Sequence, residues 1–290
     1  MNAKVKTAQL SIISNTLLII LKIAVGILSG SVSIISEAIH SSMDLVAALI
    51  AFFSVKVSDT PPDSKHPYGH GKIENISGVI EAILIFAAAA MIIIEAIKKL
   101  LGNEIVLDSL WIGSAVMAVS AIVNWIVSRR LYKVARETKS VALEADALHL
   151  KTDVYTSAGV AVGLGLILLT DIKWLDPVVA ILVALFIIKE SYDLLKRAFW
   201  PLLDSSWADD EVEELEKKLN DMGVNYHELR TRKAGNYRFI DIHIEIPENE
   251  SVGSAHKYCD NIEDVLKASF EDLNITIHVE PIEKKAYDIK

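Results

Sequence analysis

Six long apolar segments constrain this chain more than any other feature. A helix that crosses a bilayer needs about 20 mostly apolar residues, and six segments meet that need: residues 8–29, 32–56, 75–98, 110–130, 143–169 and 175–197. Charged residues, 23% of the chain, argue that another part lies outside lipid. The pattern predicts an α-helical polytopic membrane protein with six transmembrane helices and an attached soluble domain.

The distribution of charge marks a domain boundary. Residues 1–204 carry 18 Lys and Arg against 18 Asp and Glu, whereas residues 205–290 carry 11 against 20, so the net charge of −9 belongs to the last part. The apolar pattern ends at the same point. We therefore predict a transmembrane domain at 1–204 and a soluble domain at 205–290. Because a net-acidic chain is poorly suited to nucleic acid, we expect no such partner.

Basic residues near the segment ends predict the orientation. Twelve Lys and Arg lie on the side that holds the N-terminus and the soluble domain, and three lie on the other side. Since cytoplasmic loops carry the excess of Lys and Arg, both termini are expected in the cytoplasm and the protein in the cell (inner or plasma) membrane, surrounded by lipid. The first segment is too long for a cleavable signal peptide, and no A-x-A site follows it.

Two apolar segments carry the same pattern of ionisable residues. His40 and Asp44 are four residues apart in the second segment, as are His149 and Asp153 in the fifth, so each pair shares a helix face. Ionisable side chains inside a span are costly and usually mark a pathway. Two such helices facing each other offer two imidazoles and two carboxylates, which suit a tetrahedral zinc ion. The alternative is two structural His–Asp hydrogen bonds.

Glu37 and Asp146 stand three residues before the two histidines and share their helix faces. One interpretation is that they orient the imidazoles from a second layer around the metal. The other is that they lie near the cytoplasmic mouth. The sequence favours neither.

The connection after the second segment holds another group of ligand-type side chains. It reads Asp63-Ser64-Lys65-His66-Pro67-Tyr68-Gly69-His70-Gly71-Lys72, and its Pro and Gly residues predict a turn-rich loop. In such a loop Asp63, His66 and His70 can converge without a helix. A polar cytoplasmic loop without a metal is the alternative.

The soluble part has a pattern of short mixed elements. We predict helix 209–222, strand 226–233, strand 237–246, helix 254–270 and strand 273–280, with Gly223 ending the first helix and Gly235-Asn236 forming a hairpin turn. This α-β-β-α-β order is typical of a small α+β domain with its helices on one face of the sheet.

Ligand-type side chains gather on the polar face of that sheet. Alternation of Ile with polar residues places His243, His278 and Glu280 on this face. We assign His227 on the first strand and His256 on the second helix to the same set; solvated surface histidines are the alternative. Cys259 is the single cysteine, which excludes an internal disulfide, and is expected to be a small buried apolar residue.

Together these motifs resemble the cation diffusion facilitator family of divalent-metal transporters over nearly the whole chain, and within it the bacterial ferrous-iron and zinc efflux pump type. The resemblance implies a homodimer with a ferredoxin-like cytoplasmic domain. It places a transport site on His40, Asp44, His149 and Asp153, a loop site on Asp63, His66 and His70, a cytoplasmic zinc cluster on His227, His243, His256, His278 and Glu280, and an interlock between protomers on Lys72 and Asp204.

Two positions depart from the pattern of that type, which has Asp where this chain has His40 and Glu280. Two His and two Asp resemble the transport site of the family's more zinc-selective members. We therefore expect a Zn²⁺/H⁺ antiporter that exports zinc, with Zn²⁺ as both cargo and a structural or regulatory ion, and no organic cofactor. Other divalent metals (Mn, Fe, Co, Ni or Cd) remain an alternative.

Two other classes are weaker interpretations. An intramembrane zinc metalloprotease requires HExxH on a span, whereas the His-Glu pair of this chain, His227-Glu228, lies in the soluble part and lacks the second histidine. We therefore expect no enzyme. A membrane metal sensor that transports nothing is the other rival, and flux through the purified protein would distinguish it.

Overall fold

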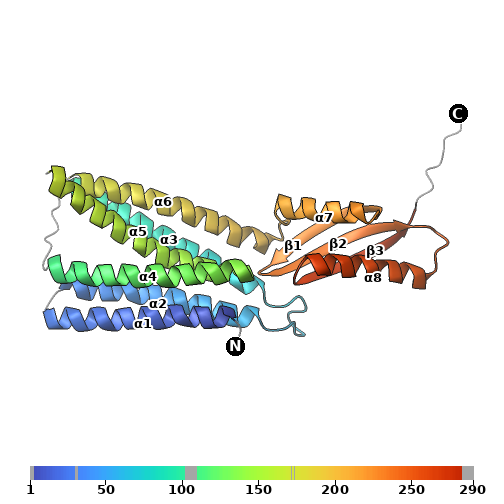
Figure 1. Ribbon diagram of the computed structural model, residues 1–290, viewed down its shortest axis with the longest axis horizontal. Coiled ribbons are helices and arrows are strands. Elements are labelled where there is room, and N and C mark those ends of the chain that lie inside the picture. The colour runs from blue at the N-terminus through green and yellow to red at the C-terminus, as the bar shows by residue number, and fades with distance from the viewer. Residues whose placement is uncertain (1–2, 30–31, 102–109, 171, 173, 283–290) are drawn as a thin grey trace. The chain divides into compact units, whose positions relative to one another are not determined.

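The computed structural model describes residues 3–29, 32–101, 110–170, 172 and 174–282. The chain divides into two compact units, Met1–Phe199 and Trp200–Lys290. The first unit consists of long helices and the second of a small sheet with helices (Figure 1).

Each of the six predicted apolar segments lies in one long helix of the first unit. The helices are α1 (Ala3–Ser29), α2 (Val32–Ser58), α3 (Lys72–Leu100), α4 (Leu110–Thr138), α5 (Val141–Thr170) and α6 (Leu175–Phe199). Within their described residues, α1, α2 and α3 contain stretches long and apolar enough to cross a membrane: Ala3–Leu28, Ala38–Ser58 and Lys72–Leu100. That all six helices cross a membrane stays a prediction.

Helix α5 is the centre of this unit. It packs against α2, α3, α4 and α6, while α1 pairs with α2 and α3 pairs with α6. One buried apolar cluster joins residues of α1, α2, α4 and α5, and another joins α3, α5 and α6. Small residues permit the close approaches: a Cβ at Gly78 of α3 would lie 2.8 Å from a methyl of Val141 and 3.0 Å from Cβ of Ala198.

A buried carboxylate ties four segments of the first unit together. Glu74, which is 0% exposed, accepts hydrogen bonds from Lys4 Nζ at 3.1 Å, Ser58 Oγ at 2.8 Å and Ser140 Oγ at 2.5 Å. Lys4 also pairs with Asp59 at 2.6 Å. A buried charge is tolerated when it is paired and fully hydrogen-bonded, so this cluster fixes the start of α1 against the start of α3 and the end of α2.

The second unit has the α-β-β-α-β order expected from its sequence. After a short 3₁₀ turn (Trp200–Leu203), the elements are α7 (Asp209–Asp221), β1 (Tyr226–Ala234), β2 (Tyr237–Ile246), α8 (Val252–Ser269) and β3 (Leu273–Pro281). The sheet order is β1-β2-β3, with β1 antiparallel to β2 and β2 parallel to β3. Gly223 and Gly235 adopt positive φ angles of 67° and 60° after α7 and in the hairpin, where glycine is the least strained residue.

The helices of the second unit cover one face of its sheet. Buried Leu215 and Leu219 of α7, and Ile262 and Leu266 of α8, pack in one cluster with the alternate isoleucines 240, 242 and 244 of β2. Since side chains alternate across a strand, residues 241, 243 and 245 point to the opposite face. This leaves that face for polar groups.

Candidate metal sites

Two helices of the first unit bring three ligand-type side chains together. Imidazole and carboxylate atoms of His40 and Asp44, from α2, and of Asp153, from α5, all lie within 4.8 Å of one another. Asp44 is buried, whereas His40 is exposed. Zinc binds nitrogen and oxygen ligands at about 2.0–2.2 Å, so pairs of ligands lie roughly 3–4 Å apart. The spacing and the donor set therefore fit a divalent cation with small adjustments of side chains.

His149 contacts Asp44 but is not itself a member of this group of three. Its Nε2 lies 3.1 Å from Asp44 Oδ1, so the histidine of α5 contacts the carboxylate of α2. The Nδ1 atom of His149 is buried and has no hydrogen-bond partner among the described residues. Asp146 accepts a hydrogen bond from Ser11 Oγ at 3.1 Å and does not hold the imidazole as the second-layer interpretation expected. The side chain of Glu37 lies outside the described part.

A cavity of about 100 Å³ is lined by His40, Asp44 and Asp153, and also by residues that the sequence analysis missed. Lys22 of α1 lines it, is 6% exposed, and donates a hydrogen bond to Ser41 Oγ at 2.7 Å. Asn124 of α4 donates from Nδ2 to Asp153 Oδ2 at 3.1 Å, and its Oδ1 is buried and has no hydrogen-bond partner in the described part of the chain. Lys22 could have been found as an ionisable residue inside an apolar segment. A single neutral Asn carries no comparable signal.

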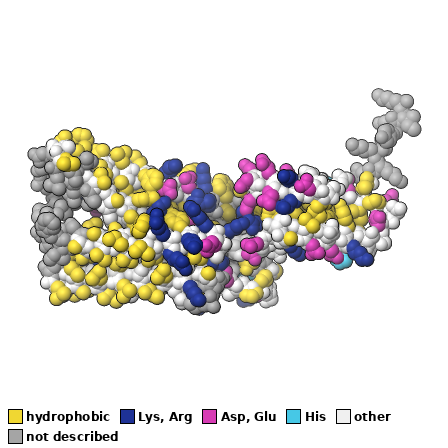
Figure 2. All heavy atoms as spheres, in the orientation of Figure 1, with side chains coloured by type: hydrophobic (Ala, Val, Ile, Leu, Met, Phe, Trp, Pro, Cys, Tyr) yellow, Lys and Arg dark blue, Asp and Glu magenta, His cyan; other side chains and the backbone are white. Residues whose placement is uncertain are grey.

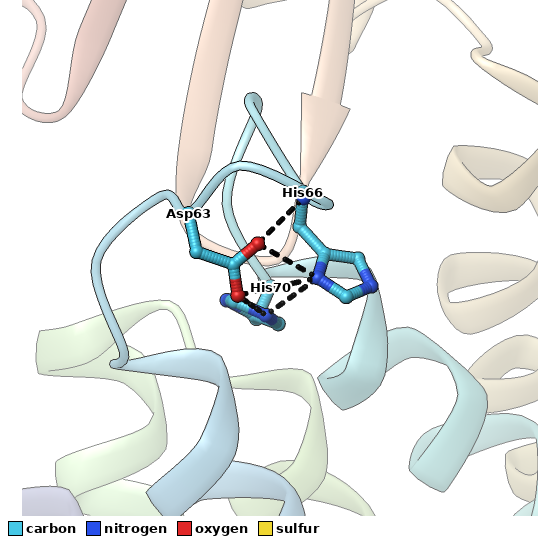
Figure 3. A group of neighbouring side chains, drawn as sticks. All are labelled: Asp63, His66 and His70. Atoms are coloured by element: carbon cyan, nitrogen blue, oxygen red, sulfur yellow. Dashed lines mark hydrogen bonds and ion pairs between the residues drawn. The ribbon is translucent and has the colours of Figure 1, made fainter.

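The loop between α2 and α3 gathers all three of its predicted ligands (Figure 3). His66 Nδ1 lies 3.2 Å from Asp63 Oδ1, and His70 Nε2 lies 3.1 Å from His66 Nδ1 and 3.4 Å from Asp63 Oδ2. Gly69, at φ +82°, turns the chain between the two histidines. Two imidazole nitrogens and a carboxylate face one point, which is a donor set that suits Zn²⁺.

Backbone contacts prepare Asp63 as an anionic ligand. The backbone N–H of His66 donates to Asp63 Oδ1 at 2.7 Å, that of Lys65 donates at 2.8 Å, and these hydrogen bonds lower the pKa of the carboxyl. His70 is held in turn by Thr60 Oγ1, 2.9 Å from its Nδ1. A metal ligand must be deprotonated, and a partner on the second ring nitrogen fixes the imidazole. The loop therefore meets both requirements.

Three histidines form a row across the sheet of the second unit. His227 of β1 pairs in register with His243 of β2, which pairs with His278 of β3. Glu280 adds its carboxylate: its oxygens lie 3.1 Å from His227 Nε2, 3.2 Å from His243 Nδ1 and 3.4 Å from His278 Nε2. A bulge after His227, with Glu228 at φ 48°, interrupts the ladder beside this row. Ligand atoms of His227, His243 and Glu280 lie within 4.8 Å of one another, a spacing that fits one metal ion.

The structure does not bring His256 to this row. His256 lies on α8, is exposed, and has Asp260 one turn away, with 3.8 Å between Nδ1 and Oδ1. Cys259 is half-buried and packs against the core, and burial raises the pKa of its thiol. Both side chains belong to the helix layer of the second unit, whereas the histidine row lies on the other face of the sheet.

The expected interlock pairs residues of different units. Lys72 begins α3 in the first unit. Asp204, at φ 54°, lies in the second unit, where its Oδ1 is 3.6 Å from Arg232 Nη1. A contact between protomers involves a second copy, so the Lys72–Asp204 interlock stays a prediction.

Comparison with known proteins gives matches along nearly all of the chain. Residues 8–203 match the family model described as "Cation efflux transmembrane domain", and residues 207–282 match "Cation efflux protein, cytoplasmic domain". The "Uncharacterized transporter sll1263" of Synechocystis sp. is 34% identical over 91% of this chain and 86% of its own length. The "Cation-efflux pump FieF" of Shewanella oneidensis is 30% identical over 96% of this chain and 95% of its own. The solved structure "Mode of Action of a Putative Zinc Transporter CzrB" is 34% identical, covers 27% of this chain and all of that one, and has a TM-score of 0.26.

Proposed function

The chain belongs to the cation efflux family, also called the cation diffusion facilitator family, and from that premise we propose that it is a Zn²⁺/H⁺ antiporter exporting zinc from the cytoplasm. Its family consists of membrane transporters of divalent cations rather than enzymes. The observation that carries the proposal is the convergence of His40, Asp44 and Asp153, with His149 against Asp44, in a cavity between α1, α2, α4 and α5.

The donor set supports zinc as the cargo. Two imidazoles and two carboxylates offer four nitrogen and oxygen ligands, which match the tetrahedral preference of Zn²⁺. Harder cations such as Mn²⁺ and Mg²⁺ prefer oxygen ligands in octahedral sites. Four protein ligands also leave no open position for an activated water, so the site suits carriage of the ion rather than hydrolysis.

The same ligands supply the coupling to protons. A ligand must lose its proton before it binds metal, so protons and zinc compete for one site. Imidazole titrates nearest to physiological pH, which makes His40 and His149 the proposed proton carriers. In the proposed cycle zinc displaces protons from the inward-facing site, and protons entering from outside displace zinc from the outward-facing site.

The remaining parts have supporting roles in this proposal. Residues 1–204 form a unit of six spans, and residues 205–290 form a cytoplasmic domain in a homodimer, with both termini in the cytoplasm. The histidine row with Glu280 binds regulatory zinc and tightens the dimer, and His256 joins it through the dimer interface. The loop residues Asp63, His66 and His70 form a further zinc site at the cytoplasmic side.

Flux measurement in proteoliposomes tests the proposal. Zinc uptake into vesicles holding the full chain should require an opposing proton gradient, and Asp44→Asn should abolish it. His40→Asp should widen metal choice towards cadmium and iron, whereas His256→Gln, a change on α8 of the second unit outside the proposed transport ligands, serves as the matched histidine control with unchanged selectivity. Zinc flux that persists after the proton gradient is collapsed contradicts antiport, and zinc binding without flux in any condition favours a sensor.

A further inference from the structure

A second, larger cavity of the first unit has a basic and aromatic lining. It has a volume of about 950 Å³ and is lined by residues of α4, α5 and α6. Helix α5 packs against both of the others and so forms the floor. Figure 2 shows Lys and Arg side chains gathered in a band towards the end of the unit where α4 and α6 end, beside a broad hydrophobic surface. We call this cavity the basic groove.

Cations outnumber carboxylates in the basic groove. Its charged lining consists of Arg129, Lys133, Arg136, Lys151 and Arg197 against Glu137, Glu144 and Glu190. Two of the cations have carboxylate partners: Arg197 lies 2.9 Å from Glu144, and Lys133 lies 3.9 Å from Glu137. The remaining cations, Arg129, Arg136 and Lys151, pair with no carboxylate among the described residues. The groove therefore presents unneutralised positive charge.

Aromatic rings position two of these cations. The guanidinium of Arg129 lies 4.3 Å from the ring centre of Trp125, and Lys151 Nζ lies 5.4 Å from the ring of Tyr132 and 5.2 Å from that of Tyr155. A cation over an aromatic face keeps its hydrogen-bond donors available for an anion. The two donors are thus held in place while remaining able to bind.

The surroundings of the groove indicate which anion it takes. Trp125 is 47% exposed, and Ile122 and Ile126 on the same helix are 59% and 55% exposed, so the groove adjoins an apolar surface of a membrane domain. Trp and Tyr are enriched at the level of lipid headgroups, and basic pockets between membrane helices bind anionic headgroups. A free phosphate ion would use the cations but not the aromatic and apolar rim.

We propose that the basic groove binds the headgroup of one anionic phospholipid, whose phosphate is held by Arg129, Arg136 and Lys151 while its acyl chains follow the apolar surface of α4. Each of these cations contributes roughly a five-fold increase in affinity, the effect expected of one Lys or Arg near an anionic lipid. None of the three is a ligand of the proposed metal sites.

Lipid binding to the purified full chain tests this proposal. Native mass spectrometry in non-ionic detergent would compare phosphatidylglycerol with zwitterionic phosphatidylcholine. The Arg129→Gln/Lys151→Gln double variant should bind phosphatidylglycerol about 25-fold more weakly. Arg130→Gln is the matched control, because Arg130 is the next residue of α4, is exposed and does not line the groove; it should bind like the unaltered protein.

The outcomes separate the alternatives. Equal binding of the two lipids, or a folded double variant that binds phosphatidylglycerol as well as the control, overturns the proposal. Displacement of the lipid by millimolar inorganic phosphate shows that a free anion is the ligand and also overturns it. If the double variant does not fold, Arg136→Gln, a single change at an exposed side chain, should still weaken phosphatidylglycerol binding about five-fold, and unchanged binding refutes the assignment.

Discussion

One ion-pair cluster joins α7, the first helix of the second unit, to the β1–β2 hairpin. The substitution Glu211→Gln tests how much this cluster stabilises the unit. Glu211 lies in the first turn of α7 and accepts a hydrogen bond from Arg238 Nη2 at 2.7 Å. It also accepts one from Lys233 Nζ. The side chain of Arg238 is 4% exposed and that of Glu211 is 22% exposed, so the cluster is largely removed from water.

The expected loss follows from this burial. Gln keeps the shape and one acceptor oxygen but removes the negative charge, which leaves a buried guanidinium without its counter-ion. Breaking a fully buried pair costs about 3–5 kcal/mol, and a hydrogen bond to a charged group contributes roughly 1.5–3 kcal/mol. Because Glu211 is partly exposed and solvent screens it, we expect Glu211→Gln to lower the free energy of unfolding of the domain by about 2 kcal/mol.

The effect should depend on pH with a definite sign. Burial alone raises the pKa of Glu211, but the hydrogen bonds from Lys233 and Arg238 outweigh it and hold the pKa below the ordinary 4.5. A carboxyl with a lowered folded-state pKa stabilises the fold above its unfolded pKa, and this contribution is lost as the pH falls through the folded pKa. The unaltered domain and the Glu211→Gln variant should differ in their free energy of unfolding by a constant amount from about pH 5.5 to 7. This difference should shrink below about pH 4.5.

A fragment of residues 205–290 gives a direct assay, because Trp207 is its only tryptophan. Trp207 is 3% exposed and lies 5.3 Å from the Phe270 ring, so its fluorescence reports the core during urea unfolding. The control is Glu263→Gln, which breaks an i,i+4 pair with Lys267 on the surface of α8. It should lower the free energy of unfolding by less than about 0.5 kcal/mol. A loss for Glu211→Gln no larger than the control, or one that persists undiminished at pH 3, refutes the reasoning.

Two further changes probe packing and metal binding. Gly78→Leu should force α3 away from Val141, because a Cβ at this position alone would lie 2.8 Å from the Val141 side chain. The change should lower the free energy of unfolding by about 1–3 kcal/mol. A lower thermal midpoint of the purified full chain checks this, and an unchanged midpoint contradicts it. In the 205–290 fragment, zinc at 100 times its dissociation constant should add about 2.7 kcal/mol to the free energy of unfolding. His243→Gln should remove this gain and His256→Gln should retain it in dilute fragment, because the structure separates His256 from the histidine row.

Much of the fold follows from local patterns, whereas the ends of the helices do not. The apolar segments predict six helices, and alternation in the tail predicts strands to within a residue of those observed. Helix α4, however, continues from the expected end at residue 130 to Thr138. A hydropathy pattern registers where apolar residues end, while helical hydrogen bonding continues through charged residues. The pairing of α3 with α6 depends on close contacts such as that at Gly78 and is not visible in single-segment patterns.

The sequence predicts the ligand groups whose members lie close together on one helix or loop. His40 with Asp44, and the loop triad, follow from helical period and turn residues, and the structure brings them together. The contact of His149 with Asp44 depends on how α2 faces α5. His256 was grouped with the sheet histidines from its residue type, but which face of a sheet a helix covers is a tertiary property. Because α8 packs on the isoleucine face of the sheet, His256 lies in the helix layer and not on the face that carries the histidine row.

Lys22 gives the proposed transport site a property that its ligands alone would not have. Two carboxylates and two neutral imidazoles neutralise Zn²⁺, yet a buried ammonium lines the same cavity, and like charges repel strongly where water is excluded. The cavity should therefore bind zinc more weakly than a structural site, which suits a carrier that must release its cargo. Lys22→Met should raise zinc affinity about ten-fold, equivalent to roughly 1.4 kcal/mol, and lower maximal flux, as measured by titration calorimetry and in proteoliposomes. Weaker zinc binding by a folded Lys22→Met protein would show that Lys22 orders the site through Ser41 instead of opposing the ion.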